Sequence, residues 1–124
     1  MSRVLVQPVD LGCPGHFCGA RNCQWRRHTQ VGHYRVSSVG NYYPDGRGNA
    51  KRTPLGCDLT DFFETMVFET LLSLDPGSEG CGCRVVKSFS EIDGARYETA
   101  GAAQQGHQQF VTKYLIQARR AAKK

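Results

Sequence analysis

The sequence predicts an α+β fold, in which a small antiparallel β-sheet packs against one long C-terminal α-helix. The first observation is a series of β-prone runs, separated by turn residues, between positions 33 and 92. The second is a change in apolar spacing, because apolar residues recur every three or four positions after Thr99. A chain of 124 residues fits one modest core, so we expect a single domain over residues 1–124 with a Cys/His-rich loop at 13–28.

The N-terminal third contains three segments with the composition of strands. A short strand over residues 4–6 is expected to end at Pro8, because proline cannot donate a hydrogen bond to a β-ladder. Residues 23–31 are compatible with an extended strand whose odd and even positions lie on opposite faces. Residues 33–43 are richer in β-forming residues, and Gly40 indicates a bend or bulge. We therefore begin the antiparallel sheet at residue 33.

The central third holds the most β-prone run of the chain, residues 61–70. The charged side chains Glu64 and Glu69 within it are typical of a strand with one face in water. We expect this run to pair with residues 33–43 across a long loop and to be followed by a further strand at 83–89.

The C-terminal third predicts a helix over residues 99–122, with Thr99 as its N-cap. Gly106 costs helix stability, roughly 1 kcal/mol relative to alanine, so we expect it to mark a close approach to the sheet. His107 lies within the apolar stripe and is expected to be a buried, hydrogen-bonded side chain rather than a metal ligand. The apolar stripe consists of Ala103, His107, Phe110, Val111, Tyr114, Leu115 and Ala118.

Charge is distributed unevenly along the chain, whose net charge is +5. Residues 1–57 carry eight Lys or Arg against two Asp, whereas residues 58–118 carry four Lys or Arg against nine acids. The last six residues add four further cations. This layout suggests a polyanion or an acidic protein as partner, and the alternative is that the acidic middle neutralises its basic neighbours internally.

Three cysteines within eleven residues indicate a metal site, because clustered thiols in a reducing compartment are more often ligands than disulfides. Zinc is the predicted cofactor, since it takes four sulfur or imidazole ligands in a tetrahedron. A compact site would use Cys13, Cys18, Cys23 and either His16 or His28. A bridging site would join Cys18 and Cys23 to Cys81 and Cys83. Two alternatives remain: reduced thiols packed as small apolar groups, and disulfides in a protein that leaves the cytoplasm.

The sequence gives no sign of an enzyme. No recognised catalytic string surrounds any of the cysteines, and residues 46–53 lack the residue order of a phosphate-binding loop. The carboxylates of the acidic middle form no convincing pair. We therefore expect a protein without catalytic residues and without a small-molecule substrate.

Cations interleaved with one tryptophan favour contact with nucleic acid, because arginine holds phosphates and tryptophan stacks on bases. The alternative is that the tryptophan belongs to the core and its neighbouring arginines are merely solvated. The predicted contact residues are Arg21, Trp25, Arg26, Arg27, Arg47, Lys51 and Arg52.

Three strings in the last two thirds of the chain, beginning at Tyr34, Phe63 and Arg96, carry a family resemblance. They are Tyr-Arg-Val-Ser-Ser-Val-Gly, Phe-Glu-Thr-Met-Val-Phe and Arg-Tyr-Glu-Thr-Ala, followed by Gly106-His107 and Val111-Thr-Lys-Tyr114. They resemble small uncharacterised proteins encoded by bacteriophages and prophages. The resemblance implies a phage context and supplies no catalytic residues.

These observations together predict a small non-enzymatic phage accessory protein that acts by binding, stabilised by zinc and contacting nucleic acid through a basic surface. The alternatives are a protein-binding modulator of a host process, including inhibition of a bacterial defence, and a minor virion component. No apolar run is long enough for a membrane span or a secretory signal, so the expected location is the cytoplasm of a bacterial host.

Overall fold

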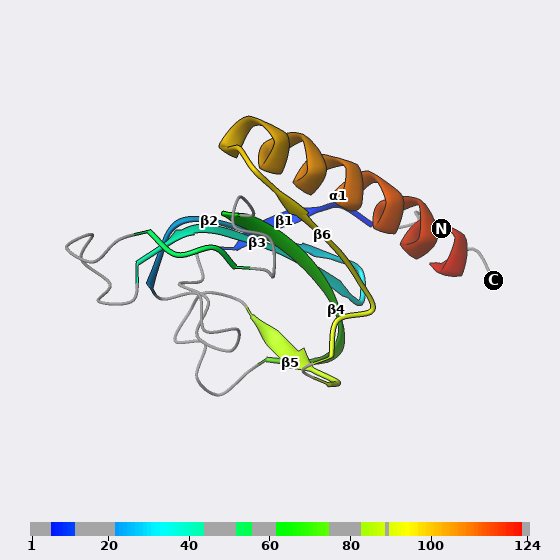
Figure 1. Ribbon diagram of the computed structural model, residues 1–124. Coiled ribbons are helices and arrows are strands. Elements are labelled where there is room, and N and C mark those ends of the chain that lie inside the picture. The colour runs from blue at the N-terminus through cyan, green and yellow to red at the C-terminus, as the bar shows by residue number, and fades with distance from the viewer. Residues whose placement is uncertain are drawn as a thin grey trace.

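A six-stranded antiparallel sheet carries a long helix along one of its faces in the part of the chain that the structure describes (Figure 1). The computed structural model describes residues 6–11, 22–43, 52–55, 62–74, 83–88 and 90–122. The elements are β1 (Val9–Leu11), β2 (Cys23–Val31), β3 (Tyr34–Tyr42), β4 (Phe63–Leu74), β5 (Arg84–Val86), β6 (Asp93–Tyr97) and α1 (Ala100–Ala122). The predicted α+β class, an antiparallel sheet with a long C-terminal helix, is thus confirmed.

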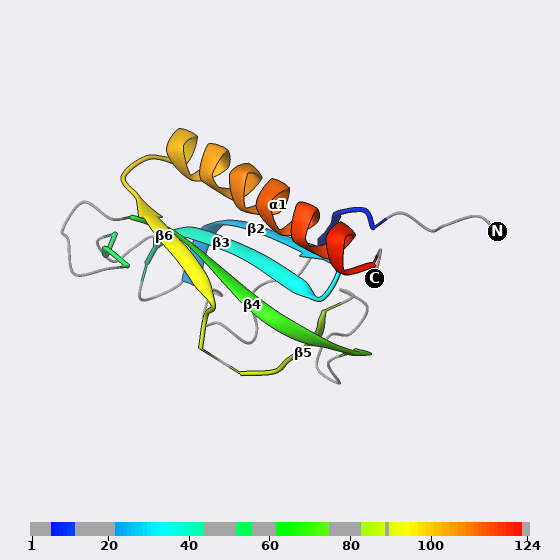
Figure 2. The same cartoon turned by 90° about the vertical axis from the view of Figure 1, so that its right-hand side faces the viewer.

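The strands follow the order β1-β2-β3-β4-β5, and β6 also pairs with β4. Strand β4 is 12 residues long, and its length lets it hold two partners in succession: β6 pairs with residues 63–67, and β5 pairs near Thr70 and Leu74. Figure 2 shows β4 running between β3 and β6 beneath the helix. The centre of the sheet is therefore formed by β2, β3 and β4.

A two-residue turn joins β2 to β3 and sets the register between them. Gly32 adopts a φ of 57°, which favours glycine, and a Cβ added there would lie 2.8 Å from the Cβ of Ala118 in α1. Val31 pairs with Tyr34 next to the turn, and the ladder continues to Cys23 opposite Tyr42. The alternation of β2 then places Trp25, Arg27, Thr29 and Val31 toward the helix.

Helix α1 begins as the sequence predicts. The N–H of Ala102 donates to Oγ1 of Thr99 at 3.2 Å, so Thr99 is the N-cap. Gly106 is the close approach to the sheet, because a Cβ at this position would collide with the phenol ring of Tyr97 on β6. The described part of the chain contains no helix long and apolar enough to cross a lipid bilayer.

The main apolar core lies between α1 and the three central strands. Its buried members are Val31, Val36, Val67, Val111 and Tyr114, and Tyr34, Phe110 and Leu115 pack against them. On β6, Asp93 accepts hydrogen bonds from the Tyr114 hydroxyl at 2.9 Å and from the Lys113 ammonium at 2.6 Å. These two bonds anchor the helix to the edge strand as well as to the centre.

The structure also tests the other predicted elements. The extended segment expected at residues 23–31 is confirmed as β2, so residues 23–28 do not belong to the Cys/His-rich loop. Among the described residues, the strand predicted at 83–89 is limited to β5. Most of the strand predicted at residues 4–6 lies outside the described residues, and neither β1 nor β6 was predicted as an element. The remainder of the predicted loop, residues 13–21, lies outside the described residues.

Candidate functional site

The predicted zinc ligands fall partly within the described residues. Cys23 and Cys83 are both buried thiols, whereas Cys13, His16, Cys18 and Cys81 lie outside the described ranges. Cys23 is paired with Tyr42 at the start of β2, near the end of the sheet where β4 begins. Cys83 precedes β5, which pairs with the opposite end of β4, at Thr70 and Leu74. Among the described side chains, no three of the types His, Cys, Asp and Glu gather closely enough to hold a metal ion. The zinc site therefore remains a prediction.

The predicted nucleic-acid residues on β2 are divided between the two faces of the sheet. Trp25 and Arg27 lie on the helix side, whereas Arg26, between them, is exposed on the opposite side. The Trp25 ring meets the Phe63 ring edge to face, with centroids 5.5 Å apart. Gly40 lies opposite Trp25 in the register and has no room for a side chain, because the Phe63 ring covers it. Trp25 is thus partly engaged in packing.

Arg27 connects the sheet to the helix. Its guanidinium donates a 3.3 Å hydrogen bond to Oε1 of Gln104 in α1 and lies 4.0 Å from Oδ1 of Asp10 in β1. The side chain of Arg27 is 32% exposed, so its cationic group still reaches solvent beside the helix. Arg27 is therefore the predicted contact residue that the fold places next to α1.

Arg52 reaches the same end of the sheet from a separate segment. Its guanidinium lies 3.6 Å above the centroid of the Phe62 ring and donates a 3.1 Å hydrogen bond to Oδ1 of Asn41. Asn41 follows the glycine that pairs with Trp25, so Arg52 lies near the same end of the sheet as Trp25. The other predicted contacts, Arg21, Arg47 and Lys51, lie outside the described residues.

Three salt bridges neutralise acids of the middle segment. Arg96 contacts Glu64 at 2.9 Å, Lys113 contacts Asp93 at 2.6 Å, and Lys87 contacts Glu69 at 3.5 Å. The hydrogen bond from Lys113 holds the pKa of Asp93 below its ordinary value. These three pairs draw on no cation from residues 1–57.

The outward side of α1 is lined by amides and cations. The helix contains no Asp or Glu, and its last turn carries Arg119 and Arg120. We call the exposed glutamines of this side the amide face, and they are Gln104, Gln105, Gln108, Gln109 and Gln117. The sequence prediction did not connect these glutamines with binding. A signal for this face was present in the sequence, because the 23 residues of the helix include no Asp or Glu.

A buried chain of hydrogen bonds crosses the interface between sheet and helix around His107. Nε2 of His107 lies 2.8 Å from Oγ1 of Thr29, and Nδ1 lies 2.6 Å from Oγ of Ser38. Oγ1 of Thr29 donates at 2.7 Å to the carboxylate of Asp10, and Oγ of Ser38 lies 2.6 Å from Oγ1 of Thr65. The prediction that His107 is a buried, hydrogen-bonded side chain is confirmed.

The direction of each hydrogen bond in this chain follows from proton counting. Thr29 has one hydroxyl proton and gives it to Asp10, so Thr29 accepts from His107, whose Nε2 must carry a proton. Burial, reinforced by the charge of Arg27, lowers the pKa of His107 to about 4, so the ring is neutral at pH 7. Nδ1 is then an acceptor, and Ser38 donates to it. Both ring nitrogens of His107 are therefore used in hydrogen bonds that link the helix to the sheet.

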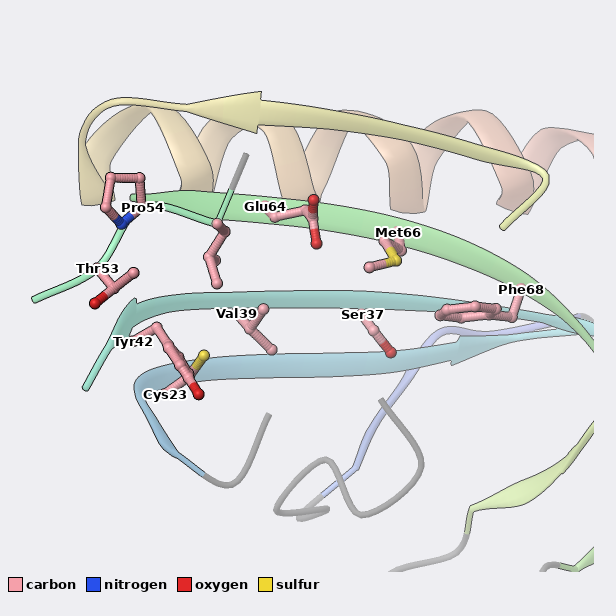
Figure 3. A pocket seen from close by; sticks show the side chains of 10 residues that line it. Cys23, Ser37, Val39, Tyr42, Thr53, Pro54, Glu64, Met66 and Phe68 are labelled. Carbon is pink, nitrogen blue, oxygen red and sulfur yellow. The ribbon is translucent and has the colours of Figure 1, made fainter. Parts of the chain in front are cut away.

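A pocket of about 210 Å³ lies on the face of the sheet opposite α1 (Figure 3). Glu64 of β4 is the one carboxylate among its lining residues, and it pairs across the ladder with Val39 of β3. Burial raises the pKa of Glu64, and the neighbouring Arg96 opposes this shift. The lining residues are Cys23, Ser37, Val39, Tyr42, Thr53, Pro54, Leu55, Glu64, Met66 and Phe68.

Comparison with protein families, with curated proteins and with solved structures found no match to this chain.

Proposed function

We propose that this protein is a non-enzymatic binding protein that contacts nucleic acid with the amide face of α1 and the adjoining Arg27. The single observation that carries the proposal is the absence of any carboxylate from α1, combined with the hydrogen bond between Arg27 and Gln104. A polyanion that approaches this side meets amides and cations on the helix, without the repulsion of a helical acid.

The amide face suits nucleic acid because each glutamine offers two N–H donors and one carbonyl acceptor. The N–H groups can donate to phosphate oxygens, and the whole amide can pair with the edge of an adenine. The four glutamines at 104, 105, 108 and 109 occupy neighbouring turns of the helix, since residues three and four positions apart lie on one side. They form a continuous strip beginning beside Arg27.

Cations at both ends of the strip supply the electrostatic attraction. Arg27 lies at the N-terminal half of the helix, and Arg120 is exposed in the last turn. Trp25 and Arg52, at the adjoining end of the sheet, provide an aromatic ring and a further guanidinium. We include them as secondary contacts, because base stacking on an aromatic ring and phosphate binding by a guanidinium would add to the affinity of the glutamine strip.

The proposal retains the phage setting and the zinc ion of the sequence prediction. The resemblance of the strings at Tyr34, Phe63 and Arg96 to phage-encoded proteins supports action in a bacterial host. The ligands proposed for zinc remain Cys13, Cys18 and Cys23 with a histidine, or Cys18 and Cys23 with Cys81 and Cys83.

The test introduces negative charge into the strip. In the variant Gln105→Glu/Gln109→Glu, two exposed amides become carboxylates of nearly the same shape. We expect wild-type protein to bind a random single-stranded oligonucleotide at low salt, with affinity that falls steeply as salt rises. The double variant should bind at least tenfold more weakly, because two new charges repel the phosphates. Fluorescence anisotropy across a salt series measures both effects.

The matched control is Ser73→Glu/Ser90→Glu, which adds the same two charges at exposed positions away from α1. If binding depends on the amide face, this control should retain affinity within about twofold to threefold. Equal losses in both variants would show that net charge alone governs binding, and absence of binding by wild type at low salt would remove the proposal.

A further inference from the structure

The pocket opposite α1 combines apolar walls with one acidic group. Val39, Leu55, Met66 and Phe68 contribute hydrocarbon or thioether surface to its lining. Glu64 lies among them on the central strand β4, and Figure 3 shows Glu64 and Met66 on β4 next to the strand that carries Val39 and Ser37. An apolar cavity with one fixed charge has the composition of a site for a small ligand.

One oxygen of Glu64 remains available for a ligand. The side chain is 11% exposed, and its Oε2 accepts a 2.9 Å hydrogen bond from Nε of Arg96. Its Oε1 has no hydrogen-bond partner among the residues that the structure describes. A carboxylate oxygen has two lone pairs, so Oε1 can accept a hydrogen bond from a donor placed in the pocket.

The row of residues around Glu64 explains how the carboxylate is held. Val39, Glu64 and Arg96 lie side by side on β3, β4 and β6, on the face away from α1. Arg96 holds the carboxylate from the β6 side, and Val39 bounds it on the β3 side. The carboxylate is therefore fixed at the junction of the pocket and the edge strand.

We propose that this pocket binds a small single-ring amine, with the ring against the apolar walls and the ammonium group on Oε1 of Glu64. The volume of about 210 Å³ is suitable, because an apolar cavity of about 150 Å³ can hold benzene. The carboxylate selects against anions, and the apolar walls select against strongly hydrated cations such as a metal ion. This site is separate from the amide face of α1, which lies on the other side of the sheet, whereas Arg52 directly precedes the lining residue Thr53.

The experiment uses benzylamine as probe and ¹⁵N-labelled wild-type protein. Titration is expected to give saturable amide shifts concentrated at the pocket residues of β3 and β4. Benzyl alcohol has the same ring and nearly the same size but no positive charge, so it should bind at least tenfold more weakly. Saturable shifts absent from the pocket, or equal affinity for the two probes, would overturn the proposal.

Two variants and one control assign the effect to Glu64. Glu64→Gln should weaken benzylamine binding about tenfold or more, because it removes the charge from the hydrogen bond. Glu69→Gln removes a carboxylate from the same strand outside the pocket lining and should leave affinity unchanged. Val39→Met should also reduce binding by filling the cavity while keeping the charge. Wild-type affinity in Glu64→Gln or in Val39→Met would contradict the assignment. The amide spectrum of each variant serves to check that the variant is folded.

Discussion

His107 shows how one buried side chain joins the layers of this protein. It lies in the apolar stripe of α1, yet both of its ring nitrogens are bonded to hydroxyl groups of the sheet. The bond with Ser38 depends on the imidazole being neutral, because a second ring proton would leave Nδ1 unable to accept from Ser38. The link between helix and sheet is therefore sensitive to acid.

We expect acid to destabilise the protein through His107. The folded-state pKa is about 4, below the ordinary value of 6.5, so the unfolded chain binds a proton at a pH where the folded chain does not. The stability contributed by the neutral ring is present above pH 6.5 and is lost as pH falls toward 4, with a total of about 3 kcal/mol. Urea denaturation between pH 7 and pH 4.5 measures the slope.

Two histidine variants separate this effect from general acid denaturation. His107→Gln should be less stable at pH 7 by about 3 kcal/mol, because buried hydroxyl groups lose partners, but its stability should change less between pH 7 and pH 4.5. His33→Gln removes an exposed histidine and should keep the wild-type slope. An unchanged slope in His107→Gln would show that another group governs the acid response.

At the scale of elements, small residues let helix α1 approach the sheet closely. Gly106 and Ala118 are the points where the helix backbone approaches the Tyr97 ring and Gly32. The sequence predicted the helix, its N-cap and the role of Gly106, because all three depend on local spacing. It did not predict β6, since Asp93 and Gly94 have low strand propensity and the strand depends on its pairing with β4.

We expect Gly106→Ala to destabilise the protein by about 1–3 kcal/mol despite the higher helix propensity of alanine. The added methyl group collides with the Tyr97 ring, and this clash outweighs a propensity gain of about 1 kcal/mol. The matched control is Gly101→Ala in the first turn of the same helix, where a Cβ meets nothing within 4 Å. This control should be neutral or stabilising by up to about 1 kcal/mol.

A second background tests the cause. In a Tyr97→Ala variant the ring is absent, so adding Gly106→Ala should become favourable. Thermal or urea denaturation of the four proteins gives the coupling between the two positions. Destabilisation of equal size in both backgrounds would mean that the helix meets some other obstacle at residue 106.

At the scale of the whole molecule, the two faces of the sheet serve different purposes. The helix face is occupied by the core and by the His107 chain, and the opposite face holds the pocket around Glu64. The sequence indicated that Glu64 belongs to a strand with one face in water, but it could not place Glu64 beside Val39 and Arg96. That arrangement depends on the register of three strands that are distant in sequence.

The same limitation applies to Trp25, Arg26 and Arg27. Their closeness in sequence suggested one contact surface, and strand alternation separates them. The binding strip proposed for α1 instead gathers Arg27 and glutamines about eighty positions downstream, and only the packing of the helix on β2 brings them together.

The final prediction at this scale concerns zinc, because a bound ion would tie Cys18 and Cys23 to Cys13 and a histidine or to Cys81 and Cys83. Protein purified without a metal-affinity tag should contain about one zinc per chain, and a chelator should lower its melting temperature. Cys23 is also packed with Val39, Tyr42 and Leu55, so Cys23→Ser is expected to destabilise the protein even without metal. Cys18→Ser is therefore the informative variant.

If zinc is bound, Cys18→Ser should lower the melting temperature in buffer, and chelator should then cause no further decrease, since the site is already lost. Cys57→Ser, the control, should leave the response to chelator as large as in wild type, because this cysteine belongs to neither proposed ligand set. Six titratable thiols with no metal, together with a melting temperature that chelator does not change, would instead mean that the cysteines act as packed thiols. Thiol burial would then replace metal coordination as the reason for their clustering.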